Sequence, residues 1–291
     1  MSAPSLDDVG ALEAGLDALE RRDTSSLPVR ARLRTSVLPP VAAAVLLLAV
    51  WSLLAASGVR PAAQLPSPSA ALRTLGALWS SGSLPTALAS SLGRALAGFA
   101  LSAVLGTALG VLLAQVRWLR AAVGPLVSGL QSLPSATWLP GAVLWFGVGD
   151  TAVYVVVLAG AIPSIALGLV SGVDRVPPLL LRVGRVLGAT RWETLRHVVL
   201  PAALPGYVSG LRLGWAFAWR SLMAAELILA VAGGGTSLGR LLDAGRRSGD
   251  MSVVLAVVTV ILAVGVVIEI GLFSPWERRL LRDRGLAGGA R

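Results

Sequence analysis

The chain has 291 residues, of which 55% are hydrophobic and 14% charged, and its mean hydropathy is +0.77. This composition lies far outside the range of soluble domains and predicts an integral membrane protein. Cysteine is absent and all 25 basic residues are arginine, which excludes a disulfide framework, a thiolate metal site and a Walker A phosphate loop, because that loop needs a lysine.

The N-terminal part divides into a polar segment and an apolar one. Residues 1–36 are polar and are predicted to form a cytoplasmic tail, and the run 37–57 is long enough to cross a membrane. A cleaved signal peptide is the alternative, because Ala55-Ala56-Ser57 could be a cleavage site. A 36-residue leader exceeds the usual length of a signal, which favours an uncleaved anchor. A connection rich in Pro, Ala and Ser follows to about residue 83.

Five further apolar runs lie within residues 85–275, which are predicted to form a helical core. Runs of this length with helical spacing indicate transmembrane helices rather than barrel strands. The prediction is therefore an all-α fold with six transmembrane helices, followed by a cytoplasmic C-terminal tail at 276–291. The five runs cover about residues 87–115, 121–146, 152–173, 205–231 and 251–273.

The third of the six runs contains two prolines that are expected to kink or break its helix, Pro134 and Pro140. Gln131, Ser135 and Trp138 follow one another at i, i+4 and i+7, which places them on one face of a continuous helix. Such polar groups inside a membrane either contact a solute or form hydrogen bonds between helices, and both alternatives stay open.

Between the fourth and fifth runs, residues 177–201 have the pattern of two short helices around a tight turn. Pro177 suits the start of the first helix, and Gly188 suits the left-handed position that ends it. Thr190 and Glu193 form a capping box for the second helix, which Pro201 is predicted to end. Each helix has an apolar face, so both are expected to lie against another surface; the faces comprise Leu179, Val183 and Val186 in the first and Trp192, Leu195 and Val199 in the second.

The fifth run carries the largest number of polar and aromatic side chains. Trp215, Trp219, Met223 and Glu226 lie on one helical stripe with Arg212, and Arg220 lies at its edge. One interpretation is a translocation pathway in which Arg220 meets an anion. The alternative is that Arg212 snorkels to the surface, the tryptophans pack against neighbouring helices and Glu226 lies near an interface.

Arginine placement orients the predicted helices. With the N-terminal tail inside, 17 arginines lie on the cytoplasmic side and five on the other side, so the loop at 177–201 is predicted to be cytoplasmic. This explains the net charge of +10 without nucleic acid, and the flanking spans disfavour a DNA-binding helix-turn-helix. His197 is the only histidine, so no multi-histidine metal site exists, and no nucleophile, base and orienting group form a catalytic set.

The spacing Gly188, nine residues, Val198, one residue, Leu200-Pro201 resembles the EAA loop of bacterial ABC importer permeases. This resemblance implies that the loop is the coupling helix that docks on a cytoplasmic ATPase. The positions of the family's Glu-Ala-Ala are occupied here by Arg182, Val183 and Gly184, so the contact made by the family's glutamate does not carry over. The implied coupling residues are Gly188, Ala189, Thr190, Trp192, Glu193, Leu195, Val198, Leu200 and Pro201.

Two further segments resemble the nitrate/sulfonate/taurine branch of these permeases. They are Leu133-Pro134-Ser135-Ala136-Thr137-Trp138-Leu139-Pro140 followed by Leu144-Trp145-Phe146-Gly147-Val148-Gly149, and Ser91 to Phe99. The resemblance covers about residues 85–276. Apart from the resemblance, the polar and aromatic residues of the third and fifth runs are the pathway candidates: Gln131, Ser135, Trp138, Trp215, Trp219, Arg220 and Glu226.

The resemblance also implies how the protein works. The chain would be the non-catalytic membrane subunit of an importer in a bacterial plasma membrane, without a cofactor of its own, while separate ATPase subunits bind ATP and Mg. A periplasmic or lipid-anchored binding protein would deliver the solute, and a second copy would complete a homodimer. The solute would be a sulfonate, taurine or nitrate. A pyrimidine-like heterocycle is the nearest alternative, and a self-sufficient channel or secondary transporter is the alternative from another class.

Overall fold

The computed structural model describes residues 38–61, 63–231 and 235–282. These residues form helices joined by short turns and contain no strand, which confirms the all-α prediction for this part of the chain. The predicted tail 1–36 and residues 283–291 of the predicted C-terminal tail lie outside the described residues.

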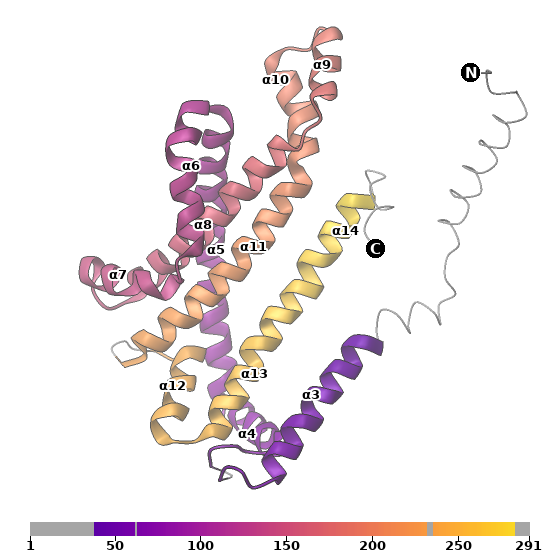
Figure 1. Cartoon of the computed structure of the whole chain (residues 1–291). Helices are drawn as coiled ribbons and strands as arrows, with labels where there is room; N and C mark the ends of the chain where they lie inside the picture. Colours follow the sequence, from indigo (N-terminus) through magenta and orange to yellow (C-terminus); the bar gives the residue numbers. More distant parts are fainter. Residues whose placement is uncertain (1–37, 62, 232–234, 283–291) are drawn as a thin grey trace, which may run out of the picture.

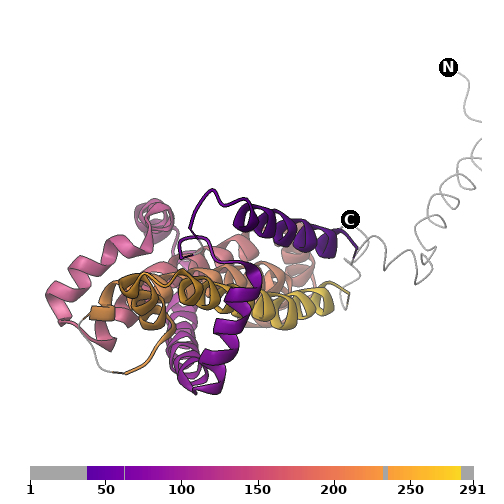
Figure 2. The same ribbon diagram turned by 90° about the horizontal axis from the view of Figure 1, so that it is seen from below.

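The first apolar run forms α3 (Leu38–Ala56), which lies along the edge of the molecule (Figure 2). Most of its side chains are exposed, and Trp51 anchors its end by donating a hydrogen bond of 3.0 Å from Nε1 to the carbonyl oxygen of Pro66. The connection to the next run contains a helix that was not predicted, α4 (Pro68–Ser80). Ser67 caps it by accepting from the backbone N–H of Ala70, and Pro68 occupies its first turn.

Three long helices form the centre of the structure: α5 (Ser83–Gln115), α8 (Asp150–Asp174) and α11 (Leu200–Ile228). Helices α8 and α11 touch through glycines, and a Cβ atom added to Gly168 would lie 2.3 Å from the Cα atom of Gly210. Small residues allow such close backbone contact, which is how membrane helices gain van der Waals packing in the absence of a hydrophobic force between them. Wholly buried residues on these helices, including Val156 and Leu222, complete the core.

The third apolar run is not one helix. It divides into α6 (Arg117–Ser132), a 3-10 turn at Ser135–Trp138 and α7 (Leu139–Phe146). The break falls at Leu133, whose backbone is extended (φ −77°, ψ 131°) because the ring of the following Pro134 disfavours helical geometry. Residues 121–146 therefore do not form one continuous helix, and the predicted break at Pro134 is confirmed. Pro140 lies in the first turn of α7, where proline is tolerated.

The remaining elements lie at the two ends of the molecule (Figure 1). At the upper end in this view, here called the loop end, α9 (Pro178–Val186) and α10 (Arg191–Thr194) follow α8, and a π-helical turn at Leu195–Val199 leads into α11. At the lower end, here called the α12 end, a 3-10 turn (Leu229–Val231) precedes α12 (Leu238–Ser248). Helix α13 (Met251–Ile268), a π-helical turn (Glu269–Phe273) and α14 (Ser274–Arg282) then return toward the loop end.

Three helical stretches of the described chain are long and apolar enough to cross a membrane: Ser83–Gln115, Asp150–Asp174 and Met251–Leu280. The apolar part of α3, Val41–Ala56, is shorter. Helix α11 has 29 residues, but Arg212, Arg220 and Glu226 make it more polar. The protein is thus an all-helical, multi-pass membrane protein, and the count of six spans stays a prediction.

Candidate functional site

The turn between α9 and α10 is built as the sequence predicts. Gly188 has a φ of +77°, the left-handed conformation, and it closes α9 with two backbone hydrogen bonds. The N–H of Ala189 donates to the carbonyl of Gly184 (2.9 Å), and the N–H of Gly188 donates to the carbonyl of Arg185 (3.1 Å). This pair of bonds is a Schellman motif, which satisfies carbonyls that the end of a helix leaves free.

The capping box that follows the turn is also confirmed. The backbone N–H and the hydroxyl of Thr190 both donate to Oε2 of Glu193 (2.7 and 2.8 Å), and the N–H of Glu193 donates to Oγ1 of Thr190 (3.2 Å). These hydrogen bonds hold the pKa of Glu193 below its ordinary value, because they favour the charged carboxylate; His197 adds a smaller effect in the same direction. The turn is therefore stabilised by an ionised Glu193.

The second short helix does not end at Pro201. The chain stays helical from Arg191 through the π-helical turn into α11, and the N–H of Leu200 donates to the carbonyl of Leu195. The wider π turn shifts the hydrogen-bond register, so that Pro201 falls in the first turn of the next α-helical segment, where its missing N–H does no harm. As a result, the loop and α11 form one continuous helical element.

The loop exposes a large apolar surface at one end of the molecule. Val186 is 86% exposed, Leu187 79%, Trp192 67% and Leu179 66%, whereas Leu195 and Val198 are half-buried. Arg182, at the first position of the family's Glu-Ala-Ala, is exposed, and Gly184, at the third, is buried against Thr194. The first apolar face predicted for the loop therefore lies on nothing in the described chain, and Trp192 of the second face is exposed as well.

The predicted stripe on α11 divides into three environments. Trp215 and Trp219 stack with their rings 6.2 Å apart and are both buried, and the edge of Phe99 on α5 meets Trp215. With Arg220 they line a groove of 460 Å³ between α11 and α13, whose apolar wall includes Ile261 and Leu262. These three predicted pathway residues therefore come together.

Arg212 and Glu226, at the two ends of the stripe, do not face that groove as pathway groups would. Arg212 pairs with Glu269 and with Oε2 of Glu277 (2.7 Å), so it joins α11 to the π turn and α14. Glu226 is 4% exposed and is bonded to α5 and α12. The stripe therefore combines pathway candidates with residues that connect helices.

The candidates on the third run do not share a helix face, because the break at Leu133 separates them. Gln131, at the end of α6, donates from Nε2 to Oγ of Ser164 on α8 (3.0 Å). Ser135 and Trp138 lie on the 3-10 turn, where Trp138 packs against the central core. For Gln131 the structure shows the hydrogen bond between helices that was one of the two alternatives.

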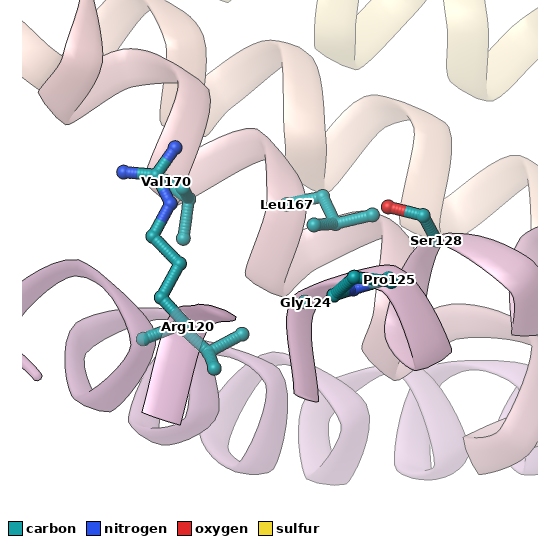
Figure 3. A pocket seen from close by; sticks show the side chains of 7 residues that line it. Arg120, Gly124, Pro125, Ser128, Leu167 and Val170 are labelled. Carbon is teal, nitrogen blue, oxygen red and sulfur yellow. The ribbon is translucent and has the colours of Figure 1, made fainter. Parts of the chain in front are cut away.

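A second cavity, of 240 Å³, lies between α6 and α8 (Figure 3). Figure 3 shows Arg120 reaching toward Val170 at one side, with Ser128 and Leu167 at the other. Arg120 also binds Asp174 through two hydrogen bonds of 2.7 and 2.5 Å. Its guanidinium is thus already paired, which marks this region as a contact between α6 and α8.

Comparison with known proteins identifies the fold. Residues 103–274 match the family described as "Binding-protein-dependent transport system inner membrane component", a match that covers more than half of the chain. The chain belongs to this family. It is accordingly an ABC importer permease, a non-catalytic subunit of the inner membrane for which no cofactor is expected, and membership implies ATPase and binding-protein partners.

Two relatives and one solved structure illustrate how far the similarity extends. The taurine transport system permease protein TauC of Escherichia coli (strain K12) is 31% identical over 196 residues, which cover 65% of this permease and 70% of TauC. The riboflavin transport system permease protein RibX of Chloroflexus aurantiacus is 30% identical over 237 residues, 81% of this permease and 87% of RibX. An inward-facing structure of the MetNI methionine ABC transporter aligns with a TM-score of 0.54 at 23% identity, over 65% of this permease and 92% of that chain, which supports the fold alone.

Some polar residues of this permease were not among its predicted site residues. Ser91 and Arg94 on α5 and Asp150 at the start of α8 form a charged network with Glu226. Ser91 and Arg94 lie in a segment that resembles the family, but nothing in a linear pattern connects them with a glutamate 135 residues away. The only sequence signal for this network was the presence of a serine and an arginine three positions apart, Ser91 and Arg94, near the start of a membrane helix.

Proposed function

We propose that this permease imports a small anion, delivered by an external binding protein, along a path that includes Trp215, Trp219 and Arg220. Two copies would form the pore, with both termini in the cytoplasm and an ATPase on each 177–201 loop. The observation that carries the choice of an anion is the environment of Arg220. This residue lies well inside α11, its side chain is exposed, and within the described chain it pairs with no carboxylate.

Within the described chain, the hydrogen bond and the ring contact of Arg220 are to residues of its own helix. Its Nε donates to the carbonyl of Ala216 on its own helix (2.9 Å), and its guanidinium lies 4.6 Å from the ring centre of Phe217. An arginine at the centre of a membrane helix costs about 2.5–3.5 kcal/mol on insertion scales. A water-filled path that carries an anion offsets this cost, whereas a lipid environment does not. The position of Arg220 therefore supports an anionic solute.

The loop supports the proposed ATPase contact in a similar way. Its exposed apolar side chains lie next to exposed arginines of the same helix, among them Arg182 and Arg185. An apolar cluster with a charged rim is typical of a surface that binds another protein. The docking partner proposed for it is the ATPase that membership in the family implies.

The relatives leave the solute open, because their names refer to taurine in one case and to riboflavin in another. Arg220 distinguishes these chemistries: a site that binds an anion through a guanidinium loses about 1.5–3 kcal/mol when the charge is removed, a factor of about ten or more. When the same charge is removed from the site, a solute without a negative charge loses much less binding free energy. A pyrimidine-like heterocycle remains the alternative.

The test is ATP-dependent uptake by the permease with its ATPase and binding protein, reconstituted in vesicles and supplied with labelled taurine, an alkanesulfonate, nitrate or riboflavin. We expect an anion to be accumulated by the wild type and about tenfold less by Arg220→Gln, with no change for Arg73→Gln, whose arginine is exposed on α4. Accumulation of riboflavin that Arg220→Gln does not reduce would overturn the anion proposal.

A further inference from the structure

Glu226 is buried at the junction of three helices, and both of its oxygens have partners. Oε1 accepts from Nη1 of Arg94 (3.3 Å), and Oε2 accepts from Oγ of Ser91 (2.7 Å) and from the backbone N–H of Gly239 (3.2 Å). A buried carboxylate is costly unless it is paired and hydrogen-bonded, as it is here. A glutamate with both oxygens occupied and 4% exposure is not available to a passing solute.

The same contacts supply the N-terminal cap of α12. The first three backbone N–H groups of this helix all find acceptors: that of Leu238 donates to Ser91 on α5 (3.0 Å), that of Gly239 to Glu226 on α11, and that of Arg240 to Ser237 (3.3 Å). Two of these acceptors come from other helices. The negative charge of Glu226 also complements the positive end of the helix dipole of α12.

Helix α12 packs closely against α11 at this junction. A Cβ atom on Gly239 would lie 2.4 Å from the Cβ atom of Glu226 and 2.7 Å from the backbone nitrogen of Leu227. Such distances essentially never occur, so the absence of a side chain lets α12 rest directly on α11. Arg94 extends the network to α8 through Asp150 (3.1 Å).

The other end of α11 is continuous with the coupling loop. From Arg191 the chain is helical through the π turn to Ile228, so a displacement of the loop is transmitted along one helical element whose far end bears Glu226. Coupling between distant sites travels through packed, rigid elements of this kind. The path from the loop to the opposite end of the molecule therefore ends at the contact between Glu226 and α12.

We propose that Glu226, with Ser91 and Gly239, makes α12 move together with α11, so that a displacement produced by the ATPase at the loop reaches the outer surface of the permease as a displacement of α12. This inference rests on the proposed docking of the ATPase on the loop. Glu226 acts as a positioning residue, and the pathway role first considered for it is replaced by this connecting role. Thermodynamic linkage requires the converse effect as well: a ligand that holds α12 biases the loop.

The absence of cysteine in the chain allows a direct test with single labels. One label is placed on α11 at Leu213→Cys and, in a separate protein, one on α12 at Ala244→Cys; both positions are exposed. Spin-label mobility is then recorded in nanodiscs with the partner ATPase, before and after addition of ATP and Mg. In the wild-type background we expect both labels to respond.

In Glu226→Gln, which keeps the shape of the side chain but removes its charge, the label on α11 should still respond and the label on α12 should lose its response. Asp243→Asn is the matched control. Asp243 is a wholly buried carboxylate of α12 whose ion pairs, with Arg246 and Arg247, stay within that helix, so its replacement should leave the α12 response unchanged. Ser91→Ala is the second variant, to be used if Glu226→Gln does not fold. It should reduce the α12 response as well.

An α12 response that survives in both variants would overturn the inference, as would its loss in Asp243→Asn to the same extent. Absence of any response at α11 in the wild type has a different meaning, because it shows that the ATPase does not act through the loop and contradicts the proposed function. The position of the label thus distinguishes failure of the inference about Glu226 from failure of the proposed function: the first concerns the response of the α12 label, and the second the response of the α11 label.

Discussion

The centre of the permease and its loop at 177–201 both depend on glycine, but for opposite reasons. At Gly168 an added Cβ atom would lie 2.3 Å from the backbone of Gly210, whereas at Gly188 nothing lies within 4 Å and the constraint is the φ of +77°. The core therefore needs the missing volume, and the loop needs the conformation. Substitutions in the core should consequently act on folding, and those in the loop on binding of a partner.

The largest effect is expected for Gly168→Ala. The added methyl group must separate α8 from α11, and overpacking of a tight core costs about 1–3 kcal/mol or more. Thermal unfolding in detergent should show a large loss of stability. The control is Gly129→Ala on α6, where nothing lies within 4 Å and alanine is the better helix former, so that stability should be unchanged or slightly higher. Equal stability of the two variants would contradict the account of the core.

Gly188→Asp should insert and fold but lose the ATPase. A side chain in the left-handed conformation costs about 1–2 kcal/mol, and the new charge lies in the turn that orients both loop helices. Co-purification of the ATPase measures the loss. The matched control is Gly82→Asp, since Gly82 has a φ of +76° and open space around it but lies at the turn between α4 and α5. Loss of the ATPase from both variants would mean that strain, and not the loop, is responsible.

Trp192→Ala separates binding from folding most directly. Because this side chain is 67% exposed, its removal should change stability by no more than about 0.5 kcal/mol. Truncation of an aromatic anchor at an interface costs about 2 kcal/mol, a roughly thirtyfold weaker Kd. Titration of the ATPase onto nanodisc-bound permease measures it. Trp145→Ala on α7, where the side chain is 75% exposed, should leave the Kd unchanged. Equal weakening by both would place the docking surface elsewhere.

The smallest effect concerns the pH dependence of the loop. Because hydrogen bonds from Thr190 lower the pKa of Glu193, the stabilisation is fully present above the pKa of an unfolded glutamate and is lost as the pH falls through the lower folded pKa. Hydrogen exchange of the Thr190 and Glu193 amides should therefore show no opening linked to Glu193 near neutral pH, and opening should increase once the pH falls below the ordinary pKa of glutamate. In Glu193→Gln, which still completes a capping box, this acid transition should disappear. An acid transition that persists in the variant would exclude Glu193 as its source.

Features that depend on neighbouring residues were predictable from the sequence. The Schellman turn at Gly188, the Thr190 capping box and the break before Pro134 each follow from a few consecutive residues, and the structure contains all three. The same rules could have revealed α4 and α12, two of the helices that were not predicted, since Ser67 and Ser237 cap them. Apolar patterning alone missed these helices because neither is long and apolar throughout.

The end of the second loop helix was mispredicted because the rule that proline ends a helix does not take the preceding π turn into account. Proline ends a helix only when its missing N–H falls where a hydrogen bond is required. The π turn at Leu195–Val199 moves Pro201 into a position that requires none. A sequence pattern does not contain the hydrogen-bond register of the preceding turn.

The sequence by itself determined that this chain is helical, crosses a membrane and has two short helices around a tight turn at 177–201, because hydropathy, helix caps and turn residues act over a few neighbouring positions. Only the tertiary structure decided which polar groups of α11 line a groove and which are bound to other helices. Trp215, Trp219 and Arg220 share a groove, whereas Glu226 is committed to Ser91, Arg94 and the start of α12. Those partners are distant in sequence, and the energy of a buried charge depends on the groups that surround it in space.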